Sequence, residues 1–166
     1  RIQNLLEGKD IGGEADAPPK PVSMIVKGAP APAFELEQLS GGTVQLADHF
    51  GNDVIVLCFW STHCGFCRKA MPQFVEIAKK FSDQKVAFYA VNERETPDKI
   101  KAYLEKENLS IPVLLDTTAK VGATYEVKGI PKIVVIGRDA LVGAVNQGLP
   151  SNLTELLSNQ IQSLLP

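Results

Sequence analysis

The sequence contains few of the residues that build disulfide scaffolds or metal centres. Its 166 residues include only three cysteines and two histidines, which are Cys58, Cys64, Cys67, His49 and His63. Three cysteines are too few for a disulfide-stapled protein, and an odd number leaves one unpaired. A structural zinc site usually takes four Cys or His ligands, and the chain has no second CxxC and no HxxxH motif. A zinc site would need both histidines beside Cys64 and Cys67, an alternative that the sequence leaves open.

Long apolar runs and blocks of like charge are also absent. The net charge is −2, and hydrophobic and charged residues make up 45% and 22% of the chain, an ordinary globular mixture. The sequence has no block of basic residues that would predict nucleic-acid binding, and no apolar run long enough to span a membrane. The chain begins at Arg1 rather than Met, so we interpret it as a fragment or a processed chain whose signal peptide or anchor would lie upstream.

The first 28 residues differ from the rest in composition. They are rich in proline and glycine, which predicts a tail or an extended linker over residues 1–28 and one folded domain over residues 29–166. The apolar triplet Met24-Ile25-Val26 is the part of this segment that is able to pack on the edge of the domain.

Hydrophobic periodicity predicts the elements that follow. Alternation around the SGG turn predicts a β-hairpin over residues 34–46. The unbroken apolar run at 53–60 predicts a strand buried on both faces. We expect a helical turn at 46–51, helices at 64–81, 96–109, 117–127 and 151–165, and strands at 85–92, 111–116, 131–137 and 141–146. Thr96 and Ser151 or Asn152 are the expected helix N-caps. This order predicts an α/β sandwich with a mixed central sheet.

Two cysteines occupy the junction between the buried strand and the helix after it, in the stretch FWSTHCGFCRKAMP at 59–72. The N-terminus of a helix offers free N–H groups and a partial positive charge, both of which stabilise a thiolate. Cys64 lies at the helix start and is the predicted nucleophile. Cys67 lies one turn further in, where it can resolve a mixed disulfide.

Five motifs in this order resemble the TlpA/ResA-like branch of thiol–disulfide oxidoreductases, within the thioredoxin-fold superfamily. They are GAPAPAFELEQLSGGTVQLADHFG, FWSTHCGFCRKAMP, AVNERET, IPVLLD and YEVKGIPKIVVIG. The similarity covers about residues 29–160. It implies a thioredoxin-like three-layer sandwich, with a mixed central sheet and an added N-terminal β-hairpin.

The resemblance also assigns two catalytic residues besides the cysteines. Pro131 takes the place of the fold's cis-proline, which brings the backbone of Ile130 beside the cysteine pair, where a substrate strand pairs with it. Glu95 takes the place of an acidic residue near the pair. A carboxylate there raises the pKa of a thiol and can accept its proton. Glu93 is a rival for this role, and two solvated glutamates before a helix are the alternative interpretation.

We expect the substrate-contacting surface to include Trp60, His63, Phe66 and Ile130. Some residues on or near this surface differ from the family pattern. His63 replaces the usual Trp before the nucleophile. It either stabilises the thiolate when protonated or is simply a solvated surface histidine. Phe66 replaces the usual Pro between the cysteines and offers an apolar face to a substrate. Lys132 replaces a Thr after the cis-proline and is expected to place a charge beside the substrate groove.

The third thiol, Cys58, precedes Cys64 by six residues and is expected to lie beneath the pair. In the apolar run VIVLCFW it is interpreted as a buried, inert hydrophobe. A slow second redox partner for Cys67 is the alternative.

The resemblance implies an enzyme that exchanges disulfides with proteins, with a redox-active disulfide and no metal or other cofactor. It implies reduction of protein disulfides outside the cytoplasm, as in keeping apocytochrome cysteines ready for haem, with electrons from a membrane or periplasmic donor. We expect a monomer without a nucleic-acid partner, either periplasmic or membrane-anchored through a segment that is not present in this chain.

Two other functions stay open. A peroxiredoxin-like peroxidase shares the leader and the fold, and would carry a Pro and a Thr or Ser before its reactive Cys. Ser61 fits the second position, whereas Leu57 does not fit the first. A metal or copper carrier would use Cys64, Cys67 and a histidine, although such carriers usually space their cysteines by three residues.

Overall fold

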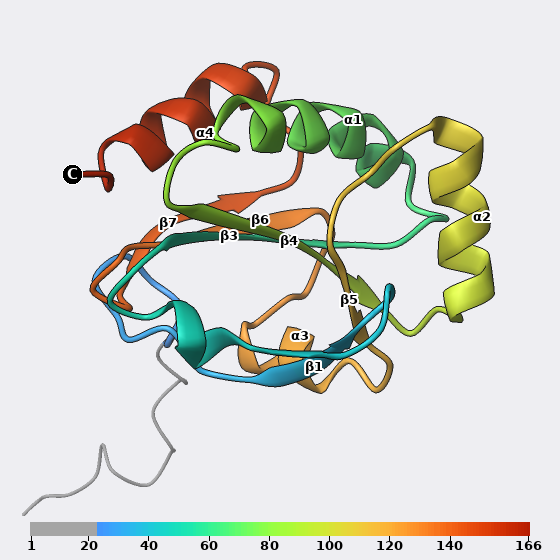
Figure 1. Cartoon of the computed structure of the whole chain (residues 1–166), viewed down its shortest axis with the longest axis horizontal. Coiled ribbons are helices and arrows are strands. Elements are labelled where there is room, and N and C mark those ends of the chain that lie inside the picture. The colour runs from blue at the N-terminus through green and yellow to red at the C-terminus, as the bar shows by residue number, and fades with distance from the viewer. Residues whose placement is uncertain (1–22) are drawn as a thin grey trace, which may run out of the picture.

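A seven-stranded mixed sheet forms the centre of the molecule, with the strand order β2-β1-β5-β4-β3-β6-β7 (Figure 1). The computed structural model describes residues 23–166, so residues 1–22 of the predicted tail lie outside the described residues. The elements are β1 Glu35–Gln38, β2 Thr43–Gln45, the 3₁₀ helix η3 Leu46–His49, β3 Val54–Trp60, α1 Gly65–Lys80, β4 Val86–Glu93, α2 Pro97–Glu107, β5 Val113–Asp116, α3 Lys120–Thr124, β6 Lys132–Ile136, β7 Val142–Gln147 and α4 Leu153–Gln162.

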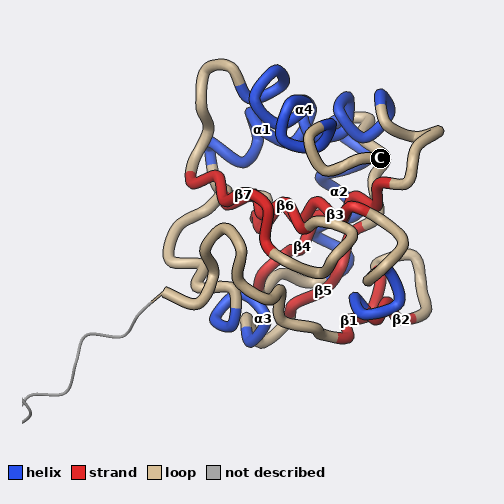
Figure 2. The backbone as a smooth tube through the Cα atoms, turned by 90° about the vertical axis from the view of Figure 1, so that its left-hand side faces the viewer, coloured by secondary structure: helices blue, strands red, loops and turns tan. Residues whose placement is uncertain are grey.

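Helices cover both faces of the sheet. The helices α1 and α4 lie side by side over one face, and α3 lies under the other, as Figures 1 and 2 both show. The hairpin of β1 and β2 extends the sheet antiparallel to β5. The predicted three-layer sandwich with an added N-terminal hairpin is therefore confirmed. None of the helices within residues 23–166 combines the length and the apolar character needed to cross a membrane.

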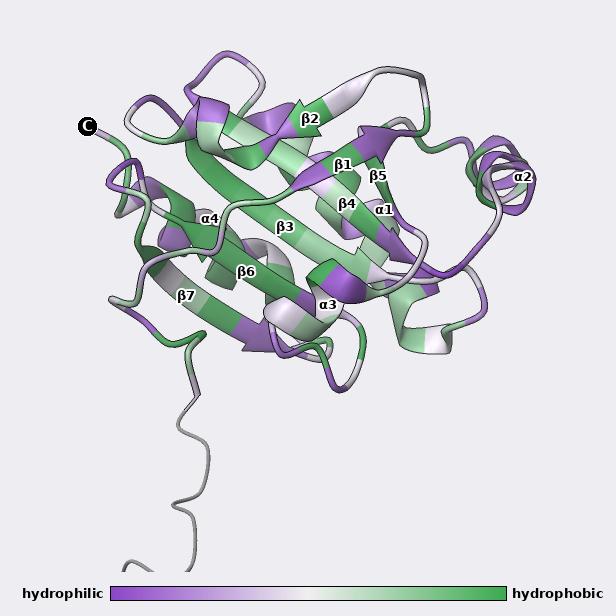
Figure 3. Ribbon diagram, turned by 90° about the horizontal axis from the view of Figure 1, so that it is seen from below, coloured by the Kyte–Doolittle hydropathy of each residue, from purple (hydrophilic) through white to green (hydrophobic). Residues whose placement is uncertain are grey.

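The strand β3 runs through the middle of the core. All seven of its residues are fully buried, as the unbroken apolar run predicted. Successive side chains of a strand point to opposite faces. Accordingly, Cys58 and Trp60 join the core under α1, whereas Leu57 and Phe59 join the core on the α3 side. Figure 3 shows β3 and β6 as the most continuously hydrophobic strands of the sheet.

The predicted N-cap residues of α2 and α4 differ in whether their side chains form a capping hydrogen bond. The Thr96 side chain accepts a hydrogen bond from the Lys99 N–H, and Pro97 occupies the first helical position of α2, as predicted. Asn152 is the N-cap residue of α4, but its side chain makes no capping hydrogen bond. That helix is held instead by an apolar face that packs against the sheet and α1, formed by Leu153, Leu157 and Ile161.

The segment before Ala29 contacts the domain along the edge strand β7. Ile25 is buried in the core on the α3 side, whereas Met24 and Val26 are exposed. The Gly28 N–H donates to the carbonyl of Val142 at 2.7 Å. The domain boundary at residue 28 stays a prediction, with residues 23–28 already lying against the domain.

Candidate active site

The two cysteines of the CxxC motif differ sharply in exposure. Cys64 is the N-cap residue of α1 and is partly exposed, whereas Cys67 is completely buried. The sulfur of Cys64 accepts a hydrogen bond from the backbone N–H of Cys67 at 3.3 Å. This N–H is one of the free donors that every helix leaves at its N-terminus. The outer sulfur is therefore accessible and lies at the N-terminus of the helix that it caps.

Burial sets the protonation of the inner thiol. It raises the pKa of Cys67 well above its usual range, and the hydrogen bond with Cys64 raises it further. The inner cysteine therefore stays a thiol at neutral pH while the outer sulfur faces solvent. In such a pair the outer sulfur is able to attack a disulfide, and the inner thiol reacts only after it loses its proton.

A loop far away in sequence lies against the outer sulfur. The strands β3 and β6 are antiparallel neighbours, with Phe59 opposite Lys132, so the end of β3 and the start of β6 meet at one edge. The Ile130–Pro131 peptide bond at this edge is cis, the geometry predicted for it. The thiol of Cys64 donates to the carbonyl oxygen of Ile130 at 3.6 Å.

The side chain of Glu95 contacts the loop between β3 and Cys64. Its carboxylate accepts four hydrogen bonds, from the N–H and hydroxyl of Thr62 at 2.7 and 2.6 Å, from Asn92 at 2.9 Å and from His63 at 3.2 Å. The side chain is only 4% exposed, and the Lys99 ammonium lies 3.7 Å away. Burial alone would raise the pKa of Glu95, but the hydrogen bonds outweigh it and lower that pKa to about 2. This carboxylate is thus an ionised anchor for residues 62–63.

Glu93, the rival acid, lies on the other face of the sheet. It pairs in register with Asp116, and its carboxylate lies against Gly122 at the start of α3. Burial and the charge of Asp116 raise the pKa of Glu93. The structure therefore brings Glu95, and not Glu93, to the loop before the cysteines.

Comparison with known proteins agrees with this arrangement. Residues 27–145 match the AhpC/TSA family. The thiol-disulfide oxidoreductase ResA of Bacillus cereus is 31% identical over 139 residues, which cover 84% of this chain and 79% of ResA. ResA of Bacillus subtilis is 31% identical over 141 residues, covering 85% of this chain and 76% of that protein. The chain belongs to the ResA-like thiol–disulfide oxidoreductases of the AhpC/TSA family.

Solved structures of DsbE and of a DsbE homologue share the fold. A thiol:disulfide interchange protein DsbE from Chlorobium tepidum superposes with a TM-score of 0.78 at 29% identity, over 86% of this chain and 99% of that one. A secreted Mycobacterium tuberculosis disulfide oxidoreductase, homologous to E. coli DsbE, gives 0.69 at 25% identity, over 79% and 96% of the two chains. The predicted family and fold are confirmed.

Two of the residues in which this ResA-like chain departs from its family lie on the surface beside Cys64. The ring of His63 is 71% exposed and contacts Glu95 through Nδ1. Phe66 is 63% exposed, and the ammonium of Lys69 lies 6.0 Å from the centre of its ring. Both side chains are exposed close in sequence to Cys64, and their contact with a substrate stays a prediction.

Trp60 lies elsewhere. It is fully buried and packs against Tyr103 of α2, with 5.5 Å between the ring centres. This burial leaves no indole surface for a substrate, so a substrate-contacting role for Trp60 is not supported. The side chain instead forms part of the core beneath the cysteines. The central position of β3 explains the difference, because this strand is buried on both faces and Trp60 lies on the same face as Cys58.

The expectation that Lys132 charges the substrate groove is wrong. Lys132 is 6% exposed and points to the α3 side of the sheet, where its ammonium donates to the carbonyls of Tyr125 and Glu126 at 2.9 and 3.0 Å. Burial lowers the pKa of this lysine. Its charge stabilises the C-terminal end of α3 and the segment that leads to the cis-proline.

Cys58 lies in the core under the pair, as expected. It is fully buried, and burial together with the charge of the nearby Cys64 raises its pKa to about 12. It shares the core cluster under α1 with Cys67. A thiol that stays protonated at neutral pH is a poor nucleophile, which favours the inert interpretation.

The structure separates the ligands that a zinc site would need. The ring nitrogens of His49 contact Asp53 and Tyr89, both at 2.8 Å, away from the cysteines. Residues 23–166 contain no group of three or more His, Cys, Asp or Glu side chains able to hold a metal ion.

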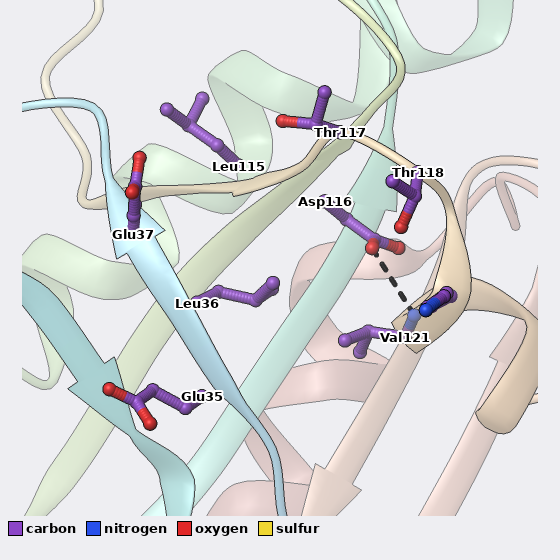
Figure 4. Close-up of a pocket in the computed structure, with 9 residues that line it drawn as sticks. Glu35, Leu36, Glu37, Leu115, Asp116, Thr117, Thr118 and Val121 are labelled. Atoms are coloured by element: carbon purple, nitrogen blue, oxygen red, sulfur yellow. Dashed lines mark hydrogen bonds between the residues drawn. The ribbon is translucent and has the colours of Figure 1, made fainter.

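A cavity of about 460 Å³ lies between β1, the end of β5 and α3, on the face opposite α1 (Figure 4). Asp116 lines it and accepts hydrogen bonds from the N–H groups of Val121 and Gly122 at the start of α3. The carboxylate is thereby committed to holding the helix. The cavity contains neither cysteine and is separate from the redox site.

Sequence reasoning missed three residues that shape the site. Thr62 and Asn92 bind Glu95, and the Arg68 guanidinium donates to the carbonyl of Thr62 at 3.2 Å. A signal for Asn92 was available, because it lies only three residues before Glu95 in the sequence. No local pattern announces Thr62 as a partner for an acid 33 residues away.

Proposed function

We propose that this chain reduces protein disulfides outside the cytoplasm by two successive exchange steps. The Cys64 thiolate attacks one sulfur of the substrate disulfide, the substrate S–S bond breaks, and the departing sulfur takes up a proton. Cys67 then loses its proton and attacks the sulfur of Cys64, which releases the second substrate thiol and leaves a Cys64–Cys67 disulfide. The substrate gains two electrons, and the protein pair loses two.

The observation that carries this proposal is the asymmetry of the pair at the start of α1. Cys64 is partly exposed, caps the helix and accepts the Cys67 N–H, whereas burial holds the pKa of Cys67 high. An exposed attacking thiol backed by a buried resolving thiol is the arrangement that this exchange needs.

The backbone beside the cis-proline is the proposed docking edge for the substrate. Its carbonyl at Ile130 lies 3.6 Å from the sulfur of Cys64, within reach of an extended substrate strand. His63 and Phe66, which lie one residue before and two residues after Cys64, expose their side chains to solvent. Pro131 and Glu95 act by positioning: the first orients this backbone, and the second holds the loop before the nucleophile.

Membership of the same family supports the proposed partners and location. Relatives named thiol–disulfide oxidoreductases, one solved relative being described as secreted, support an extracytoplasmic protein substrate. We propose apocytochrome cysteines as one substrate class, a monomeric protein, and a membrane or periplasmic donor that reduces the Cys64–Cys67 disulfide again. The redox-active disulfide is the only group that this chemistry requires.

Trapping of mixed disulfides tests the assignment. We expect Cys67→Ser to accumulate a covalent adduct with a disulfide-bearing protein, since nothing resolves it, and Cys64→Ser to give none. Non-reducing electrophoresis and mass spectrometry detect the adduct. The reverse pattern would show that the roles of the two cysteines are exchanged.

Two further measurements separate this function from its alternatives. A peroxidase would consume hydrogen peroxide in a thiol-coupled assay, and a metal carrier would retain stoichiometric metal when purified in the reduced form. We expect neither result.

A further inference from the structure

Positive charge gathers around the cysteine pair, although the chain as a whole carries a net charge of −2. Residues 59–72 contain Arg68 and Lys69 and no acidic residue, and residues 127–131 contain Lys128 and no acidic residue. All three cations are exposed. The acid that lies close by, Glu95, is buried and occupied by hydrogen bonds. The surface around Cys64 is therefore basic.

Helix stability does not explain Lys69 or Phe66, whereas Arg68 also holds the loop before the pair through the Thr62 carbonyl. The N-terminus of a helix favours acidic residues, yet the first turn of α1 has none, and Arg68 and Lys69 follow directly after it. An aromatic ring that is 63% exposed, as Phe66 is, also contributes little to the core. Residues that work against helix stability or stay in water indicate a binding role.

The side chains of Phe66, Arg68 and Lys69 form one surface. The Arg68 guanidinium is held toward the loop by its hydrogen bond to the Thr62 carbonyl, and its Nη2 lies 4.0 Å from where a Cβ at position 65 would be. Lys69 reaches over the ring of Phe66. A shallow cavity of about 420 Å³ is lined by Gly65, Phe66, Arg68 and Lys69. An apolar floor with two cations at its rim thus lies directly beside the nucleophile.

We infer that this surface selects protein disulfides whose cysteine is flanked by an acidic and an apolar residue. A substrate carboxylate pairs with Arg68 and Lys69, and the apolar side chain lies on the ring of Phe66. The inference rests on the proposed reductase function and specifies the class of substrate. Complementary charge acts mainly by accelerating the encounter, so its effect belongs in the rate of the first exchange step.

Matched disulfide peptides test the inference. We would compare peptides that differ only in the residues beside the cysteine, namely Glu and Leu, Gln and Leu, Lys and Leu, or Glu and Gly. The measurement is the second-order rate constant for their reduction by the reduced protein. We expect the Glu–Leu peptide to react about three- to tenfold faster than the Lys–Leu peptide at low salt, with the ratio falling at high salt.

Variants locate the selectivity. Lys69→Glu is expected to reduce the advantage of the Glu–Leu peptide over the Lys–Leu peptide, because Arg68 and Lys128 remain. Phe66→Ala is expected to abolish the advantage of Glu–Leu over Glu–Gly. Lys85→Glu is the matched control, because Lys85 is an exposed lysine just before β4, at the end of the sheet remote from the cysteines. It should leave the ratios unchanged. Ratios between peptides cancel any general effect of a variant on the thiol.

Reduction of a small uncharged disulfide separates a failure of the proposed selectivity from a failure of the reductase function. If hydroxyethyl disulfide is reduced while the Glu–Leu and Lys–Leu peptides react at equal rates, the selectivity is overturned and the reductase function stands. A faster Lys–Leu peptide, or ratios that Lys69→Glu leaves unchanged, would also overturn the selectivity. If the reduced protein reduces neither hydroxyethyl disulfide nor any peptide, the reductase function falls and this inference falls with it.

Discussion

At the scale of single residues, Glu95 is a buried acid whose hydrogen bonds indicate a positioning role at the redox site. Four hydrogen bonds and a nearby lysine hold its carboxylate, and its pKa lies at about 2 instead of the usual 4.5. An acid this strong is a weak base toward a thiol. We therefore assign Glu95 to holding Thr62 and His63 in place and to setting the electric field beside Cys64.

This assignment predicts a pH dependence of folding. A lowered folded-state pKa adds stability above the unfolded pKa of about 4.5, which is lost as the pH falls toward 2. We expect Glu95→Gln to remove about 2–3 kcal/mol of this acid-sensitive stability. Urea unfolding between pH 2 and 7 measures it. Parallel curves for the variant and the parent protein across this range would contradict the assignment.

The same variant should change thiol reactivity. Removing a negative charge near the pair favours the Cys64 thiolate, so alkylation of Cys64 should be faster in Glu95→Gln at a given pH. Timed labelling with iodoacetamide, followed by mass spectrometry, measures the rate. Glu93→Gln is the control, because Glu93 lies on the other face of the sheet and should leave the rate unchanged.

Cys58 is a second residue whose environment predicts its behaviour. With a pKa of about 12 and no exposed surface, it should resist alkylation in the folded, reduced protein, while Cys64 reacts quickly and Cys67 slowly. Cys58→Ala should leave turnover nearly intact and cost about 1 kcal/mol of stability through lost packing. A Cys58–Cys67 disulfide in oxidised, otherwise native protein would contradict the inert role.

At the scale of elements, Lys132 links α3 to the loop that carries the cis-proline. Lys132→Met keeps most of the side-chain volume but leaves the carbonyls of Tyr125 and Glu126 without this donor. We expect a loss of about 1–3 kcal/mol in the free energy of unfolding. The neighbouring exposed Lys128 supplies the control variant Lys128→Met, which should cost little. Equal stability of the two variants would show that the buried ammonium contributes nothing.

At the scale of the whole molecule, the sheet order assembles the site from three distant segments. Neighbouring strands β6, β3 and β4 bring the cis-proline, the cysteine helix and the Glu95 loop to one edge. For a reductase we expect the Cys64–Cys67 couple to have a reduction potential of about −270 mV. A strong oxidant would have a potential of about −120 mV. Equilibration with dithiothreitol and glutathione buffers, read by alkylation, measures the potential. A midpoint near −120 mV would indicate disulfide formation instead of reduction.

Local chemistry in the sequence accounts for most of the elements and for the cysteine pair. The apolar run at 54–60, the Thr96–Pro97 helix start and the CxxC at a strand–helix junction all depend on residues within a few positions of one another. Short-range periodicity and capping are therefore enough to predict them. The roles given to Pro131 and Glu95 came from the family resemblance, which carries tertiary information that no local pattern contains.

The tertiary structure decided where individual side chains point and which distant groups they meet. Trp60 faces the core, and Lys132 turns away from the groove, because alternation along β3 and β6 assigns each side chain to one face of the sheet. Thr62 reaches Glu95 only because β3 and β4 end side by side, whereas Asn92 reaches it from three residues away on the same segment. Sequence by itself determined the chemistry of the thiol pair, since that depends on one strand and one helix end. The packing of neighbouring strands determined the surroundings of the pair, since these arise from contacts between segments far apart in the chain.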